Sequence, residues 1–163
     1  MSFTSPIVFK ANLPLENTLI FEEEYKQQLK LSLKDKEELK DQGAEFIYII
    51  EKDSGEVIGE TYYIEVDKLK EEIKGLTKWK NRNAIYVYST TILSKYQGHG
   101  LGKILKAFFL GQVNRKFSFI LGHAKSGASW DLNKMFGAIL IEEEKDWENT
   151  GEIYIFYKID VEA

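Results

Sequence analysis

A glycine-rich hexapeptide, Gln97-Gly98-His99-Gly100-Leu101-Gly102, stands between two different apolar patterns. The run before it, Ala84 to Leu93, is rich in β-forming residues, and the run after it, Leu101 to Val113, has apolar residues at helical spacing. The order is therefore a strand, a glycine loop and the start of a helix. A helix start presents backbone N–H groups without helical partners and the positive end of the helix dipole. Because glycine lets a bound group approach the backbone closely, this segment predicts a phosphate or pyrophosphate site.

The spacing of the glycines narrows the kind of phosphate site. They do not form the dinucleotide pattern G-x-G-x-x-G, and Gly102-Lys103 is followed by Ile104 rather than by the Ser or Thr of a P-loop. The hexapeptide does fit Q/R-x-x-G-x-G/A, with Gln97, Gly100 and Gly102 in register. At these positions the chain resembles the GNAT superfamily, the GCN5-related N-acetyltransferases. In that family the loop holds the pyrophosphate of acetyl-coenzyme A (acetyl-CoA).

Two other segments extend the resemblance. Ser54 to Gly59 resembles the family's hairpin turn and the start of its third strand, and Leu132 to Ala138 resembles its L-Y-x-k-x-G-F segment, imperfectly. The similar region runs from about Phe46 to Ile159. The resemblance implies an α/β (α+β) protein of the GNAT fold, with a mixed, mostly antiparallel sheet of about six to seven strands flanked by helices. We expect residues 1–163 to form one domain.

Composition excludes several classes of site. The chain has no cysteine, which rules out disulfides, cysteine-ligated zinc and a cysteine nucleophile, and its two histidines make a histidine-rich metal site improbable, so no metal is expected. The formal charge of −4 argues against a nucleic-acid partner and weakly favours cationic acceptors. No run is apolar enough for a membrane span, and residues 1–14 lack the apolar centre of a signal peptide, so we expect a cytoplasmic protein without a membrane partner.

The periodicity of the chain predicts the following elements. The N-terminal part is expected to hold a strand at Ile7–Lys10, a helix after Pro14 with a stripe of Leu15, Leu19, Tyr25 and Leu29, and a second helix capped by Ser32 with Asp35 and ended by Gly43. Strands are expected at Phe46–Glu51, Glu56–Val66, Ala84–Leu93, Phe117–Leu121, Ala138–Glu144 and Glu152–Val161. Further helices are expected at Asp67–Lys74, at Leu101–Val113 with a stripe of Leu101, Ile104, Leu105, Phe108 and Gln112, and at Ser129–Phe136.

One segment departs from the family layout. Asp67 to Asn83 is an insertion where the family more often has a tight turn, and we expect it near the acceptor side of the site.

The resemblance assigns acetyl-CoA to two neighbouring segments. The backbone of Ile92 and Leu93 would pair with the pantetheine amides, as a strand is added to a sheet edge. The pyrophosphate would be held by the loop residues Gln97, Gly98, His99, Gly100, Gly102 and Lys103. The side chains of Lys103 and Lys106 either add positive charge there or are simply solvated, and His99 is expected to be an exposed loop residue.

The group that removes a proton from the amine is left open by the sequence. The family often has Glu or His on the strand before the loop, where this chain has Tyr86 and Tyr88. Tyrosine is a poor base at neutral pH, so these residues either relay a proton through water or are ordinary strand aromatics. Glu60 and His123 are the other candidates, with a solvent-facing charge as the alternative for Glu60.

The group that protonates the leaving thiolate shows the sharpest departure from the family. The family's tyrosine corresponds here to Asn133, which can donate a hydrogen bond but cannot release a proton, and the family's nearby asparagine corresponds to Ser126.

The sequence therefore predicts an N-acetyltransferase in which a primary amine attacks acetyl-CoA directly. The alternative is a catalytically weak acyl-CoA-binding module that serves as an interaction domain. The acceptor is a small molecule or a protein amine, and Tyr62, Tyr63 and Trp79 either line its pocket or pack in the core.

Overall fold

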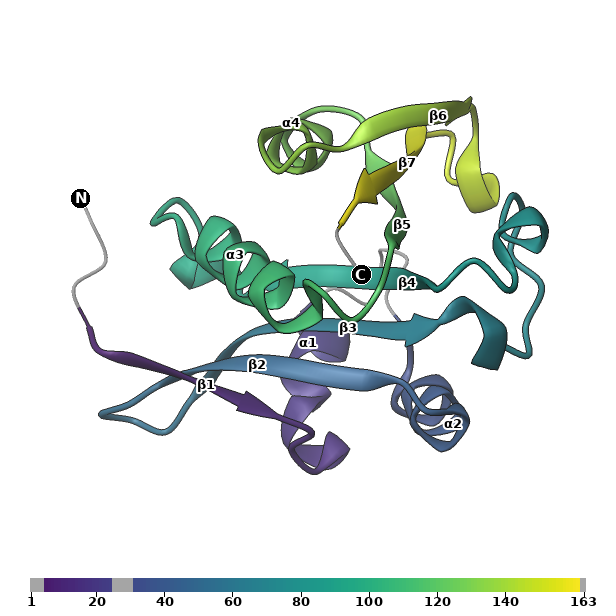
Figure 1. The fold of residues 1–163 in the computed structure, drawn as a ribbon. Coiled ribbons are helices and arrows are strands. Elements are labelled where there is room, and N and C mark those ends of the chain that lie inside the picture. The colour runs from purple at the N-terminus through teal and green to yellow at the C-terminus, as the bar shows by residue number, and fades with distance from the viewer. Residues whose placement is uncertain (1–4, 25–30, 162–163) are drawn as a thin grey trace. The chain divides into compact units, whose positions relative to one another are not determined.

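The structure is a computed structural model that describes residues 5–24 and 31–161. Within them, seven strands form a sheet in the order β1-β2-β3-β4-β5-β7-β6 (Figure 1). The strands are β1 (Ile7–Ala11), β2 (Glu45–Glu51), β3 (Val57–Glu65), β4 (Ala84–Ile92), β5 (Phe119–Lys125), β6 (Ile139–Glu144) and β7 (Tyr154–Asp160), and the helices are α1 (Leu19–Glu24), α2 (Leu33–Gln42), α3 (Leu101–Val113) and α4 (Ala128–Met135). This confirms the expected fold class. The predicted stripe residues Tyr25 and Leu29 lie outside the described residues.

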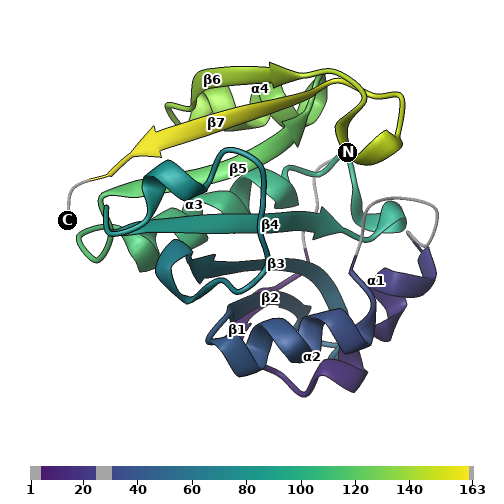
Figure 2. The same ribbon diagram turned by 90° about the vertical axis from the view of Figure 1, so that its right-hand side faces the viewer.

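The chain forms two compact units. The first comprises Met1–Ile64 and Ser89–Gln112, and the second comprises Glu65–Tyr88 and Val113–Ala163. In the first unit, β1 pairs antiparallel with β2 and β2 pairs antiparallel with β3. In the second unit, β4 runs parallel to β5, and β5, β7 and β6 pair antiparallel in that order (Figure 2).

The first unit has helices on both faces of its strands. Successive side chains of a strand point to opposite faces. On β3, Tyr62 lies under Lys36 of α2, with the ammonium 5.6 Å from the ring centre, whereas Tyr63 packs against Phe109 of α3 at a ring distance of 5.3 Å. These contacts place α2 and α3 on opposite faces of β3, as the two views also show (Figures 1 and 2).

The caps of α2 follow directly from its sequence. The Ser32 hydroxyl accepts a hydrogen bond from the Asp35 N–H at 3.2 Å. At the other end Gly43 has φ +109°, and its N–H reaches the carbonyls of Leu39 and Lys40. Both predicted signals are confirmed, because a cap depends only on residues within one turn of the helix end.

The buried face of α3 differs from the predicted stripe. Leu101, Leu105, Phe109 and Val113 are each 2% exposed or less, whereas Ile104 is 42% exposed. Ile104 follows the predicted helical spacing but lies on the exposed side of the helix. Both stripes fit a helical period, and contacts such as that of Phe109 with Tyr63 decide which one faces the strands.

The segment Asp67–Lys74 does not form the predicted helix. It contributes only to a 3₁₀ turn at Val66–Lys68, and a second 3₁₀ turn follows at Thr77–Trp79. A helix of eight residues is marginal by itself. Here the insertion is a loop whose apolar residues join the buried cluster of the second unit. That cluster consists of Val66, Ile73, Leu76, Trp79, Ala84, Tyr86, Leu121 and Phe156.

Candidate functional site

The glycine loop of the first unit has the predicted order of a strand, a loop and a helix start. β4 ends at Ile92, and α3 begins at Leu101. Gly98 and Gly100 have φ values of +81° and +80°, which other residues rarely adopt. A Cβ built on either glycine would meet no atom of the described structure within 4 Å. Glycine is therefore needed for the backbone conformation, and this backbone can be approached closely.

Hydrogen bonds from neighbouring elements fix the loop. The Gln97 side-chain amide donates to the Ile92 carbonyl at 3.0 Å, which joins the loop to the end of β4. The Tyr96 hydroxyl donates to the Glu56 carboxylate at 2.7 Å, and the Lys95 ammonium lies 3.1 Å from the same carboxylate. The Tyr96 hydrogen bond, followed by that of Lys95, lowers the pKa of Glu56. The sequence did not predict that Tyr96 and Glu56 anchor the loop. Its one hint was the predicted hairpin turn, which places Glu56 at the start of a strand.

The two lysines of α3 have different surroundings. The N–H groups of Leu101 to Lys103 belong to the first turn, where a helix supplies no backbone partners, and the Lys103 side chain is exposed. Lys106 is only 2% exposed, and burial lowers its pKa to about 8. The idea that Lys106 is simply solvated was therefore wrong, whereas Lys103 is an exposed lysine at the helix start.

Glu60 lies in a buried ion pair in the first unit. Its two carboxylate oxygens accept from the Lys36 ammonium at 2.8 and 3.1 Å, and the two side chains are 3% and 4% exposed. The alternative of a solvent-facing charge was therefore wrong. Burial, together with the nearby charge of Glu60, also raises the pKa of Tyr48. Any proton transfer to Glu60 requires that its ion pair with Lys36 first be broken.

Tyr86 of β4 and His123 of β5 form a hydrogen-bonded pair in the second unit. The Tyr86 hydroxyl lies 2.8 Å from His123 Nδ1. The imidazole is stacked between Trp147 and Phe156, at ring distances of 3.8 and 4.7 Å. His123 Nε2 is buried, and no hydrogen-bond partner for it is present in the described part of the chain. The sequence proposed both residues separately, but their pairing depends on the register between two strands.

Both members of this pair are neutral at pH 7. Burial, together with a smaller contribution from the charge of Lys74, lowers the pKa of His123 to about 3. Burial raises the pKa of Tyr86 well above its usual value, with smaller contributions from Tyr88 and other groups. The rings of Tyr86 and Tyr88 meet edge to face at 5.1 Å, so the two tyrosines share one side of β4. The pair can therefore orient an uncharged hydrogen-bonding group, but it is a weak base.

Three solved structures resemble this chain closely in fold. NAA60 from Arabidopsis thaliana in complex with acetyl-CoA has a TM-score of 0.73 at 12% identity, covering 96% of this chain and 99% of that chain. The ribosomal-protein-alanine N-acetyltransferase from Brucella melitensis has a TM-score of 0.70 at 15% identity, covering 94% and 99%. A GNAT-family protein from Desulfovibrio desulfuricans has a TM-score of 0.65 at 15% identity, covering 95% and 99%. No family model and no curated protein matches the sequence.

The chain has the GNAT fold. Its departures from the GNAT sequence pattern lie in the second unit. Asn133 of α4 is buried, and its amide donates to the Ser129 carbonyl at 2.9 Å, within the same helix. Its oxygen is buried, with no hydrogen-bond partner among the described residues. Ser126 is exposed, and its N–H donates to the Ile153 carbonyl. Asn133 thus has an unused acceptor where the GNAT pattern has a proton donor.

The three aromatic residues expected near an acceptor pocket pack in the interior of the two units. Tyr62 is 2% exposed and stacks on Phe46, and Tyr63 packs against Phe109. Trp79 is 7% exposed and belongs to the cluster of the second unit. The core-packing alternative therefore holds for all three.

The described residues contain neither a metal-binding cluster nor a membrane-spanning helix. Residues 5–24 and 31–161 contain no group of three or more His, Asp or Glu side chains placed to hold a metal ion. No helix in the same ranges has the length and apolar character needed to cross a membrane.

Proposed function

We propose that this protein is an N-acetyltransferase that transfers an acetyl group from acetyl-CoA to a primary amine by direct attack of the amine. The observation that carries the proposal is the loop of Gly98 and Gly100, with positive φ at both glycines, immediately before α3. The fold supports it, since the NAA60 structure of the same fold is a complex with acetyl-CoA. A primary amine is the acceptor class, and both small molecules and protein amines belong to it. We further propose a cytoplasmic location, in keeping with a chain without cysteine.

The residues of the loop fit a pyrophosphate. The backbone there is open to approach, and the first turn of α3 supplies N–H donors together with the helix dipole. We assign the pyrophosphate to the backbone of Gly98, His99, Gly100, Gly102 and Lys103, with Gln97 fixing the loop.

The end of β4 is assigned to pantetheine. The Leu93 N–H donates to the Ile58 carbonyl, and the Leu93 carbonyl accepts from the Tyr96 N–H. The Ile92 carbonyl is used as well, by the Gln97 side-chain amide, so Ile92 and Leu93 are both kept as candidates for pairing with the pantetheine amides.

The side chains of the second unit are suited to orienting rather than to strong acid–base chemistry. Acetyl-CoA supplies an activated acetyl group as a thioester. Tyr86 and His123 are both neutral at pH 7, so we assign them to holding an amine or a water molecule by hydrogen bonds, with Tyr88 beside them. Glu60 is the remaining carboxylate candidate, but its ion pair with Lys36 favours a structural role.

Asn133 favours a second candidate function. An amide cannot protonate a departing thiolate, so Asn133 stabilises it at most by a hydrogen bond. This observation supports an acyl-CoA-binding module with weak or no transfer activity. The two functions differ in one measurable outcome, which is the release of CoA thiol when an amine is supplied.

The test begins with acetyl-CoA binding. At about 100 times its dissociation constant, acetyl-CoA stabilises a binding protein by roughly 2.7 kcal/mol. We expect this thermal shift in the parent protein and its loss in Gly100→Asp, which adds bulk and negative charge to a residue with φ +80°. Gly111→Asp is the matched control, because Gly111 is exposed on the same helix and a Cβ there meets nothing within 4 Å.

The second step is an amine panel with detection of released CoA thiol. Thiol release with at least one amine supports the enzyme. Binding without release from any amine supports the binding module. The absence of a thermal shift in the parent protein overturns both candidates.

A further inference from the structure

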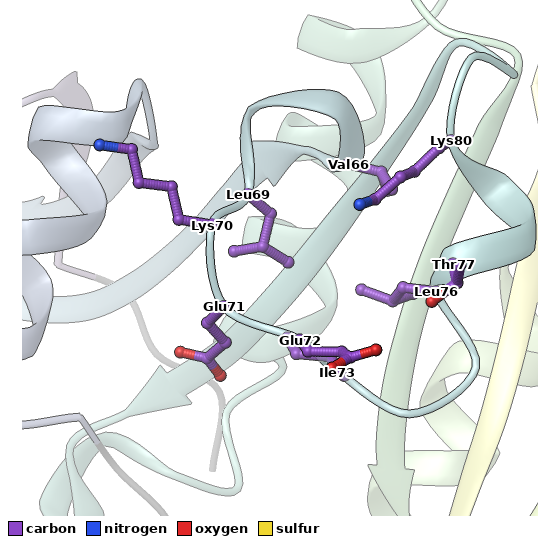
Figure 3. A pocket seen from close by; sticks show the side chains of 9 residues that line it. All are labelled: Val66, Leu69, Lys70, Glu71, Glu72, Ile73, Leu76, Thr77 and Lys80. Carbon is purple, nitrogen blue, oxygen red and sulfur yellow. The ribbon is translucent and has the colours of Figure 1, made fainter.

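The insertion between β3 and β4 contains a cavity of about 260 Å³ (Figure 3). Its apolar lining is formed by Val66, Leu69, Ile73 and Leu76, and charged side chains stand around it. In Figure 3 the side chains of Leu69 and Leu76 approach the cavity from opposite sides, and the ammonium end of Lys80 is turned toward it. One water molecule occupies about 30 Å³ of liquid, so the cavity has room for roughly six to nine non-hydrogen atoms.

The walls of the cavity are fixed by the rest of the second unit. Val66 and Leu76 are 1% and 3% exposed and belong to the central cluster of that unit. The Asn81 N–H donates to the Asp67 carboxylate at 2.7 Å, which closes the insertion on itself. Gly75 has φ +93°, and a Cβ there would lie 2.9 Å from the Phe156 ring, so the loop packs tightly against β7. The walls of the cavity are therefore held in place by contacts within the second unit.

The cavity adjoins the Tyr86–His123 pair. Tyr86 belongs to the same cluster as Val66, Ile73 and Leu76, and Tyr88 packs against that cluster. Burial is the main cause that raises the pKa of Tyr86 and of Tyr88, and the negative charge of Glu71, which lines the cavity, adds to both shifts. Glu71 stands between Leu69 and Ile73 in the loop, and both of these residues pack with the cluster that also holds Tyr86 and Tyr88. A cation held by Glu71 would lie on the tyrosine side of the cavity.

We propose that this cavity receives the apolar body of the acceptor, and that Glu71 binds the acceptor's ammonium group. The substrate class is then a primary amine with one positive charge and a short apolar chain or side chain. This inference rests on the proposed acetyltransferase function. The other charged lining residues are Glu72, Lys70 and Lys80. In Figure 3 the Lys80 ammonium is turned toward the cavity and that of Lys70 away from it, so the charge of Lys80 opposes a second ammonium group inside the cavity.

Direct binding is tested first, in the full chain without acetyl-CoA. n-Hexylamine, which is cationic at pH 7, is titrated while the methyl NMR signals of Leu69, Ile73 and Leu76 are recorded. We expect these signals to shift with saturation, and Glu71→Gln to weaken binding by about 3- to 10-fold. Glu143→Gln is the matched control, because Glu143 is exposed on β6 and does not line the cavity. Leu69→Trp fills the cavity, and we expect it to abolish the shifts.

Selectivity is tested next, with acetyl-CoA present. We expect the KM for n-hexylamine to be at least about tenfold lower than that for methylamine, because burial of several methylene groups favours the longer amine. Leu69→Trp should remove this difference by raising the KM for n-hexylamine toward that for methylamine. If Leu69→Trp does not fold, the affinity of Glu71→Gln for n-hexylamine still tests whether the cavity binds the acceptor. Glu71 is exposed, and its isosteric replacement leaves the core intact.

The outcomes separate this inference from the proposed function. Turnover of amines without methyl shifts or chain-length selectivity overturns the cavity as the acceptor subsite and leaves the acetyltransferase standing. Methyl shifts without turnover of any amine overturn the acetyltransferase, and with it the acceptor role of the cavity.

Discussion

Replacement of the buried Lys106 by methionine is expected to stabilise the protein. Lys106 lies on α3 and is 2% exposed, and burial lowers its pKa from 10.5 to about 8. At pH 7 the side chain is protonated in both the folded and the unfolded state, so the folded state carries a charge in poorly hydrated surroundings. A pKa difference of about 2.5 corresponds to a cost of about 3 kcal/mol, since one pKa unit is worth about 1.4 kcal/mol.

An opposing interaction reduces this figure. The Lys106 ammonium lies 5.4 Å from the centre of the Phe109 ring, and a cation–π contact of this kind contributes about 1 kcal/mol. Methionine has a similar length, carries no charge and adapts readily to a packed interior. The expected net gain for Lys106→Met is therefore about 2 kcal/mol at pH 7. For a chain of this size, that gain raises Tm by about 4–8 °C.

The pH dependence tests the reasoning more sharply than Tm does. The folded-state pKa lies below the unfolded value, so between pH 8 and 10.5 the unfolded state binds more protons and parent stability rises with pH. The methionine variant lacks this contribution. The difference in unfolding free energy between the two proteins should therefore be largest below pH 8 and shrink toward pH 10.5.

The assay is urea denaturation at several pH values, with Lys34→Met as the control. Lys34 is exposed on α2, and its replacement should change stability by no more than about 0.5 kcal/mol. Comparing the parent with each variant cancels the titration of tyrosines in the same pH range. A destabilising Lys106→Met, or a gain that stays constant from pH 7 to 10.5, would refute the assignment of a buried, costly charge.

Three further predictions concern other buried groups. Lys36→Met leaves the buried Glu60 carboxylate uncompensated and should lower the unfolding free energy by about 3–5 kcal/mol. Adding Glu60→Gln should recover part of that loss, and equal losses in the single and double variants would contradict the ion pair. Gly75→Ala should lower the unfolding free energy by more than about 1 kcal/mol in urea denaturation, because φ is +93° and the new methyl group meets the Phe156 ring. An unchanged unfolding free energy would contradict this packing. The folded-state pKa of His123 lies below its unfolded value, so stability is lost as pH falls from 6.5 toward 3. Between pH 6.5 and 4.5 His123→Gln should remove about 2 kcal/mol of this acid sensitivity, and an identical pH profile in parent and variant would contradict a buried neutral imidazole.

The sequence by itself determined the features that depend on residues close together in the chain. The helix cap at Ser32 and the left-handed Gly43 are both local, and both follow the predicted pattern. The same holds for the strand, glycine loop and helix start that end at Leu101, because the positive φ of Gly98 and Gly100 is a conformation that glycine adopts without strain. The resemblance carried by this loop, together with the segments Ser54 to Gly59 and Leu132 to Ala138, was enough to predict the GNAT fold.

Tertiary structure alone decided which side chains meet. His123 and Tyr86 are 37 positions apart, and Lys36 and Glu60 are 24 apart, so neither pair leaves a local signal in the sequence. Strand register brings the first pair together, because β4 and β5 run parallel with Tyr86 opposite Leu121. Helix packing brings the second pair together by laying α2 over β3.

The insertion shows the same limit for secondary structure. Its charged, evenly spaced residues favour a helix by pattern, yet an isolated helix of that length gains little free energy. Packing of Ile73 and Leu76 against the cluster of the second unit, and the close approach of Gly75 to Phe156, select a loop instead. The cavity within that loop exists because residues from its two ends fold back on one another, and contacts of this kind are set by the tertiary structure rather than by neighbours in the sequence.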